Sequence, residues 1–172
     1  MSYDWTRFEK QVFIAAPSTE VFQAWAVPNE LTRWFIAEAN YSTNGRVKSG
    51  SAQIESNDQY HWRWHQDLEA SGNVREVVAG KQIVFTFGKQ SPESLVDVLV
   101  TVTVSDEGDG CTKLSLVQEN MADTPYGRHY HLSCNLGWSF FMTNLKGLLE
   151  HGIDLRETHP ERVEAARAIS VS

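Results

Sequence analysis

Alternating aromatic residues are the pattern in this sequence that best suits ligand chemistry. Between residues 59 and 65, Tyr60, Trp62 and Trp64 occupy every second position, with polar residues between them. In an extended strand these three rings share one face. Indole and phenol side chains combine a large apolar surface with one polar group. The rings therefore predict either ordinary core or the wall of a ligand cavity.

Two polar residues are candidates for the few hydrogen-bonding groups of such a cavity. Gln118 continues the alternation of apolar residues on its strand, so we expect it to face inward. Glu76 is in phase with the valines two residues before and after it, which predicts the same orientation. An enclosed carboxylate could be a hydrogen-bond partner or a general acid or base. The alternative is a salt bridge from Glu76 to Arg63 or Arg75.

Other reactive side chains do not form a recognisable site. His129, His131 and Cys134 are close in sequence, but zinc sites typically need four ligands and no second cysteine is nearby. We expect both histidines in a loop before a helix and predict no metal. Ser133 and Ser139 lack a nucleophile elbow, so no catalytic residue is predicted. No glycine-rich phosphate motif is present, and no cofactor is expected.

Composition narrows the function classes further. The 172-residue chain has six Trp, eight Phe and five Tyr, and a net charge of −7 without any Lys/Arg cluster. Nucleic acid is therefore an improbable partner, and an anionic membrane surface would repel the chain. No apolar run reaches the roughly 20 residues of a membrane span, and residues 1–10 do not resemble a secretory signal. Cys111 and Cys134 make no disulfide framework, which favours a cytoplasmic protein.

The elements expected to position these residues follow from hydrophobic periodicity. A first strand is followed by two short helices, the second beginning after Pro28, and then by further strands joined by tight turns, which predicts an antiparallel sheet. The predicted strands span residues 8–15, 59–65, 74–78, 83–87, 95–105 and 112–119, with a loose strand and turn within 40–52 and turns at 67–73 and 106–110.

The last part of the chain predicts one long helix. Apolar residues recur at three- and four-residue steps over residues 133–151, and Gly152 is expected to cap the helix. Gly137 is expected to let this helix approach the sheet closely. A short helix is predicted over 159–168. Together the elements predict an α+β fold, with a curved antiparallel sheet of about seven strands around a long C-terminal helix.

Several segments resemble one known family. The chain resembles the activator of heat-shock-protein-90 ATPase homologue family over about residues 8–155. The family belongs to the START-like (SRPBCC) superfamily, which also contains polyketide cyclases, lipid-transfer domains and the birch-pollen allergen type. The likeness is carried by the segments IAAPSTEVFQAW (14–25), LTRWF (31–35), GNVRE (72–76), IVFTF (83–87), GCTKLSL (110–116) and NLGW (135–138).

The resemblance implies a helix-grip fold with a cavity between the sheet and the long helix. We expect one START-like domain over 1–172, with its core at about 8–155 and a C-terminal extension at 156–172. The eukaryotic co-chaperone that gives the family its name has a further N-terminal domain that binds the chaperone, and this chain is expected to lack it. No motif in the likeness is catalytic.

Three functions follow as hypotheses. The first is a binding domain for a small hydrophobic or aromatic ligand of unknown identity. The second is a stress-related chaperone-cofactor-like interaction protein, and the third a cyclase- or hydrolase-type enzyme that uses Glu76. The sequence indicates no oligomeric state. The predicted ligand-binding residues are Tyr60, Trp62, Trp64, Glu76, Phe85, Gln118, Trp138 and Phe141.

Overall fold

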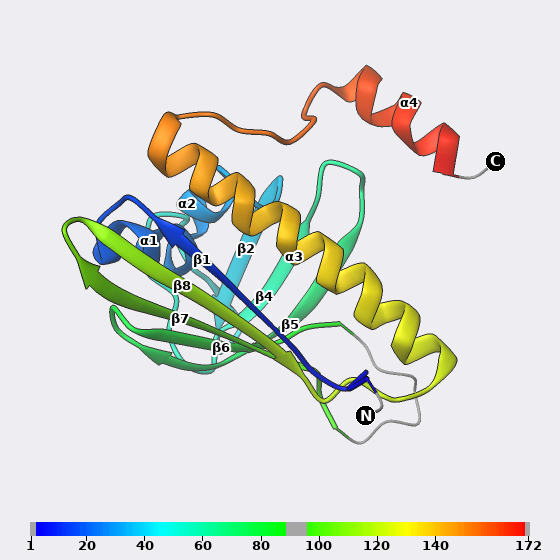
Figure 1. Cartoon of the computed structure of the whole chain (residues 1–172), viewed down its shortest axis with the longest axis horizontal. Coiled ribbons are helices and arrows are strands. Elements are labelled where there is room, and N and C mark those ends of the chain that lie inside the picture. Colours follow the sequence, from blue (N-terminus) through cyan, green and yellow to red (C-terminus); the bar gives the residue numbers. More distant parts are fainter. Residues whose placement is uncertain (1–2, 89–95, 171–172) are drawn as a thin grey trace.

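A computed structural model describes residues 3–88 and 96–170 (Figure 1). The chain forms one antiparallel sheet and four helices, in an order close to the predicted one. The elements are β1 (Phe8–Ile14), α1 (Ser18–Ala26), α2 (Pro28–Leu31), β2 (Glu38–Thr43), β3 (Arg46–Val47), β4 (Gln59–Arg63), β5 (Glu69–Val78), β6 (Gln82–Thr86), β7 (Leu99–Gly108), β8 (Cys111–Glu119), α3 (Pro125–His151) and α4 (Pro160–Ser170).

The sheet is curved and α3 runs diagonally across one of its faces (Figure 1). Its strand order is β1-β8-β7-β6-β5-β4-β2-β3, and all neighbouring strands are antiparallel. The first strand along the chain thus pairs with the last one, since β1 lies beside β8 at one edge of the sheet. The predicted helix-grip architecture is confirmed, with eight strands in place of about seven. The additional strand is β3, which forms a hairpin with β2. The chain reverses between them at Asn44 and Gly45, and both residues have positive φ angles.

A hydrogen bond from a tryptophan indole joins α1 to the loop that follows α2. Pro28 is the first residue of α2 and has no N–H, so it cannot donate to the carbonyl of Ala24 four residues earlier. The indole Nε1 of Trp34 donates to that oxygen instead, at 2.9 Å. Trp34 is fully buried, so the tandem helices and the loop after them form one packed unit.

The long helix α3 begins at Pro125, earlier than the predicted residue 133. The side chain of Thr124 caps it by accepting a hydrogen bond from the backbone N–H of Gly127 at 3.1 Å. The Thr124–Pro125 pair is a helix-start signal that the periodicity argument missed. The helix ends at Gly152, which has the expected left-handed conformation (φ 68°). Its 27 residues are roughly 40 Å long.

Two strands differ from the prediction. Residues 69–73, predicted as part of a turn, are the first half of β5 and pair with β4. The turn itself is shorter, and the backbone N–H of Trp64 donates to the carbonyl of Leu68 at 2.9 Å to close it. The polar residues that suggested a longer turn lie on the exposed face of β5. Leu95, the predicted start of β7, lies outside the described residues, and the β7 ladder begins at Leu99.

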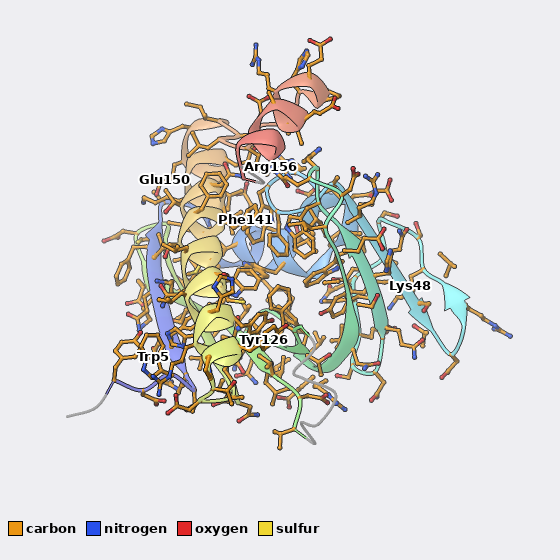
Figure 2. All side chains as sticks on the ribbon, turned by 90° about the vertical axis from the view of Figure 1, so that its right-hand side faces the viewer. Trp5, Lys48, Tyr126, Phe141, Glu150 and Arg156 are labelled. Carbon is orange, nitrogen blue, oxygen red and sulfur yellow. The ribbon has the colours of Figure 1, made fainter. Side chains whose placement is uncertain are left out.

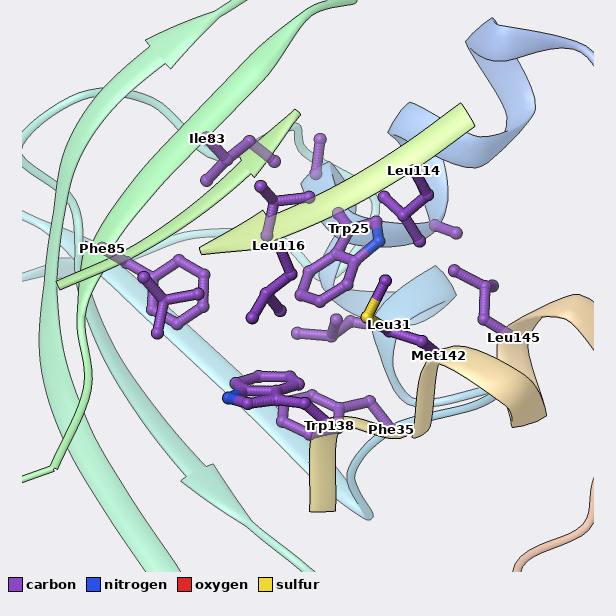
Figure 3. Close-up of a cluster of buried hydrophobic side chains, with 14 of the residues drawn as sticks. Trp25, Leu31, Phe35, Ile83, Phe85, Leu114, Leu116, Trp138, Met142 and Leu145 are labelled. Carbon is purple, nitrogen blue, oxygen red and sulfur yellow. The ribbon is translucent and has the colours of Figure 1, made fainter. Parts of the chain in front are cut away.

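Aromatic and aliphatic side chains pack together between the sheet and α3 (Figure 3). Phe35 is at the centre of this cluster. Its ring stacks on Trp138, with centroids 5.1 Å apart, and meets Trp62, Trp64 and Phe141 edge to face at 4.9 to 5.4 Å. Trp138 is 2% exposed, as its helical spacing predicted.

Candidate ligand-binding groove

A groove opens between α3 and the sheet at the β4–β5 hairpin. Its volume is about 550 Å³, which is within the range of small-molecule sites. Figure 2 shows Phe141 on the side of α3 that faces the strands. Aromatic and aliphatic side chains dominate the lining, which comprises Phe35, Trp64, Gln66, Leu68, Glu69, Ala70, Phe87, Gly88, Tyr130, Ser133, Cys134, Gly137, Trp138, Phe140 and Phe141.

One stripe of α3 forms the helical wall of the groove. Tyr130, Cys134, Gly137 and Phe141 follow one another at steps of four, three and four residues, which places them on one helix face. Gly137 interrupts this stripe because it has no side chain. A Cβ atom built there has no heavy atom within 4 Å. The expectation that Gly137 brings the helix close to the sheet is therefore wrong, and its small size leaves space instead.

The polar groups beneath the groove are paired with each other. Gln118 is fully buried, and its Oε1 accepts a hydrogen bond from Trp138 Nε1 at 2.8 Å. Its Nε2 lies 3.3 Å from the sulfur of Met121. The hydroxyl of Tyr130 donates to the carbonyl of Phe87 at 2.9 Å. These contacts satisfy polar groups that would otherwise be costly to bury.

Cys134 is the most reactive side-chain type in the lining, but its surroundings make it unreactive. Burial raises the pKa of the Cys134 thiol, and hydrogen bonds with Gln118 and Tyr130 offset only part of that effect. A thiol with a raised pKa stays protonated near neutral pH and is a poor nucleophile. The arrangement favours binding over covalent chemistry at this position.

The structure divides the predicted site residues into two groups. Trp64, Trp138 and Phe141 line the groove. Trp62 and Phe85 are buried in the core beside it, 2% and 3% exposed, and their rings pack edge to face.

Two further predicted residues are also held in the core. The hydroxyl of Tyr60 donates to the carbonyl of Thr86 at 2.5 Å. Gln118 faces inward as predicted, but its amide is used by Trp138 and Met121. Both polar groups therefore stabilise the fold around the groove.

The predicted inward orientation of Glu76 is wrong. The β5–β6 register shifts between Val74 and Glu76, which is the position of a β-bulge. A bulge inserts one extra residue and reverses the side-chain phase beyond it, so that Val77 faces the core and Glu76 is exposed. The carboxylate of Glu76 accepts a hydrogen bond from Gln82 Nε2 at 3.0 Å on the outer face.

Sequence reasoning missed several lining residues, among them Phe35, Phe87, Tyr130 and Cys134. Phe87 is two residues beyond Phe85, so strand alternation could have found it. The apolar periodicity predicts a helix start at residue 133, which leaves Tyr130 in a loop and Cys134 in the first turn, whereas Thr124 and Pro125 start the helix earlier. Phe35 is expected on the second short helix with Leu31 and Trp34, but α2 ends at Leu31 and Phe35 lies in the turn after it.

The two histidines near Cys134 belong to the long helix, and one of them has structural partners. His129 and His131 lie within α3, not in the predicted loop. His131 is fully buried, with Nδ1 3.0 Å from the carbonyl of Trp5 and Nε2 2.9 Å from the hydroxyl of Tyr3. Within residues 3–88 and 96–170, no three His, Cys, Asp or Glu side chains are grouped so that they could hold a metal ion. A helix that could span a bilayer is likewise missing from this part of the chain.

Several solved structures have a fold similar to that of this chain. The protein in the "Aha1 dimer from Colwellia psychrerythraea" is 16% identical, with a TM-score of 0.68 over 85% of this chain and 97% of that chain. DynU16, "a putative protein in the dynemicin biosynthetic locus", is 18% identical, with a TM-score of 0.69 over 89% of this chain and 50% of that chain. PFC0360w, "an HSP90 activator from plasmodium falciparum", is 19% identical, with a TM-score of 0.60 over 84% of this chain and 96% of that chain.

The fold and the groove define the class of protein. A curved antiparallel sheet that packs around one long helix is the helix-grip architecture shared with these structures. The family model described as "Activator of Hsp90 ATPase homolog 1-like protein" matches residues 15–150. The chain therefore belongs to that family. A comparison with curated protein sequences found no match.

Proposed function

We propose that this protein binds a small apolar ligand in the groove between α3 and the β4–β5 hairpin. The observation that carries the proposal is the gap at Gly137, between Cys134 and Phe141 on the helix face that lines the groove. A helix packed only for stability would fill such a position, because glycine in a helix interior costs about 1 kcal/mol relative to alanine.

The groove wall supports an apolar occupant. Ring faces and edges from Trp64, Phe87 and Phe141 surround the space, and burying apolar surface against them stabilises a complex by roughly 25 cal/mol per Å². Trp64 and Trp138 both line the groove, so a ligand there will change tryptophan fluorescence.

The test fills the groove from the helix. Gly137→Phe places a ring in the open space, and we expect it to abolish the binding of hydrophobic dyes while the protein stays folded. Leu136→Phe is the matched control, because Leu136 is the adjacent residue, is 72% exposed and lies outside the lining. Binding is measured by titration of tryptophan and dye fluorescence, and folding by circular dichroism and thermal melting.

The titrations of the two variants distinguish a ligand in the groove from a dye bound elsewhere. Saturable binding that Gly137→Phe removes and Leu136→Phe preserves supports a groove ligand. Binding that is unchanged in Gly137→Phe would place the dye elsewhere and contradict the proposal, as would the absence of saturable binding to the unmodified protein.

Glu76 is exposed on the outer face of the sheet, so the enzymatic hypothesis gains no support from its position.

A second candidate function is a chaperone-cofactor-like interaction. The family name supports it, and so does an exposed apolar row on α3, where Leu132, Leu136 and Phe140 follow at four-residue steps and the first two lie outside the groove lining. If this row contacts a chaperone of the Hsp90 class, Leu132→Asp combined with Leu136→Asp will abolish stimulation of the chaperone's ATPase. An ATPase rate that this protein does not change would reject the candidate.

A further inference from the structure

The lining of the groove carries almost no charge. In the part of the chain that the structure describes, no Lys or Arg lines it, and Glu69 is its one acidic residue. Glu69 belongs to the exposed face of β5, and its carboxylate lies 3.9 Å from Nε2 of His61, which is exposed on the neighbouring strand. The carboxylate therefore points away from the ring-lined space, and the side chains that enclose that space are neutral.

The described arginines at this end of the molecule are paired away from the groove. Arg63 contacts the carboxylates of Glu38 and Asp67. Arg128 contacts Asp123 at 2.6 Å, and its guanidinium lies 5.5 Å from the ring centroid of Trp5. An anion that entered the groove would lose hydration without gaining a counter-ion from either side chain, which is unfavourable in an apolar site.

The buried hydrogen-bond donors of the groove are also committed, whereas Gln66 and Ser133, which also line it, are exposed side chains. The indole N–H of Trp138 donates to Gln118, and the hydroxyl of Tyr130 donates to the carbonyl of Phe87. Sites that select anions supply several such donors to the negative oxygens. Here the buried donors of Trp138 and Tyr130 are used inside the protein, and ring surfaces remain for contact.

We infer that the groove selects uncharged, flat aromatic molecules over aromatic anions that carry a carboxylate or sulfonate. This inference rests on the ligand-binding role proposed above. Ring surfaces supply the attraction through stacking and edge contacts, and the missing counter-ion supplies the discrimination. Selection therefore depends on the charge and shape of the ligand.

A pair of fluorescent probes with one aromatic skeleton tests this selectivity. N-phenyl-1-naphthylamine is uncharged at about pH 7, and 8-anilinonaphthalene-1-sulfonate differs from it by one sulfonate. We expect the uncharged probe to bind at least about tenfold more tightly. The titrations are repeated in about 1 M salt, where the Debye length falls to about 3 Å, because the net charge of −7 would also repel an anion at low salt.

A charge placed in the lining provides the decisive control. Ser133 is exposed and lines the groove, whereas Ser139 is exposed on the same helix outside the lining. Ser133→Arg and Ser139→Arg change the net charge equally. We expect Ser133→Arg alone to tighten sulfonate binding, by at least about fivefold, because it supplies the missing counter-ion.

Each result bears on one of the two proposals. If both probes bind, Gly137→Phe abolishes both, and the sulfonate binds as tightly as the uncharged probe in high salt, the selectivity inference is wrong and the groove ligand stands. Equal responses of Ser133→Arg and Ser139→Arg would also overturn the selectivity inference. If neither probe binds, or both still bind Gly137→Phe, the proposed function fails and the selectivity inference fails with it.

Discussion

At the residue scale, one buried carboxylate joins several loops. Asp58 is fully buried and accepts hydrogen bonds from Thr43, from Lys48 Nζ at 2.9 Å and from the backbone N–H of Glu55 at 2.8 Å. Burial alone would raise the pKa of Asp58, but the hydrogen bonds from Thr43, Lys48 and Glu55 outweigh it, and the pKa is lowered from 3.8. Ionised Asp58 therefore stabilises the β2–β3 hairpin against the chain that precedes β4.

This contact predicts a pH-dependent contribution to stability. A lowered folded-state pKa means that the contribution is present above the unfolded pKa and is lost as pH falls through the folded one. We expect Asp58→Asn to reduce the free energy of unfolding by about 3 kcal/mol near pH 7, and by progressively less below about pH 4. Urea unfolding of both proteins across pH measures the difference, and a difference independent of pH would refute the assignment.

At the element scale, two glycines of α3 have opposite roles. A Cβ added at Gly127 would lie 1.8 Å from the carbonyl oxygen of Ala122, so the chain before the helix packs directly on this position. A Cβ added at Gly137 meets only open space. The first glycine is required by the close approach of backbone, and the second lowers helix stability without any packing reason.

These two positions predict stability changes of opposite sign. Gly137→Ala should raise the free energy of unfolding by up to about 1 kcal/mol, because alanine loses less backbone entropy in a helix. Gly127→Ala should lower it by about 1–3 kcal/mol through overpacking. Denaturant midpoints of the two variants test the pair. A destabilised Gly137→Ala protein would show that the space at Gly137 is not open.

At the scale of the whole molecule, hydrogen bonds from Arg156 link the C-terminal segment to the loop that carries Phe35. The guanidinium of Arg156 donates to the carbonyls of Ile36 and Thr32 at 3.1 and 3.0 Å and pairs with Asp154. Its side chain is only 8% exposed. Arg156 thus fixes the loop that places Phe35 in the groove wall, although the two residues are far apart in the sequence.

These hydrogen bonds predict that Arg156, which does not line the groove, influences both the stability of the protein and ligand binding. Arg156→Ala leaves two carbonyls without this donor, and we expect it to destabilise the protein by roughly 3 kcal/mol and to weaken probe binding in the groove. Arg162→Ala is the control, since Arg162 is 72% exposed and its one ion-pair contact is at 3.6 Å. Thermal melting and probe titration provide the two readouts. Equal behaviour of the two variants would show that these hydrogen bonds do not hold the groove wall.

The sequence by itself determined the properties that depend on local geometry. Strand alternation predicted that Tyr60 and Trp62 share one face and that Gln118 faces inward, and helical spacing predicted that Trp138 meets the sheet; all four side chains are buried. A strand or helix has a fixed side-chain period, so the orientation of a residue follows from its neighbours in sequence. The order of the main elements was predictable for the same reason.

Tertiary structure alone decided which inward residues reach the groove. The bulge before Glu76 shifts the β5–β6 register, and the path of α3 leaves Trp62 and Phe85 in the core while Trp64 and Phe141 line open space. Both features depend on how distant segments pair and cross, and local periodicity carries no information about that. The groove exists because a helix with a missing side chain at Gly137 passes over one particular part of the sheet.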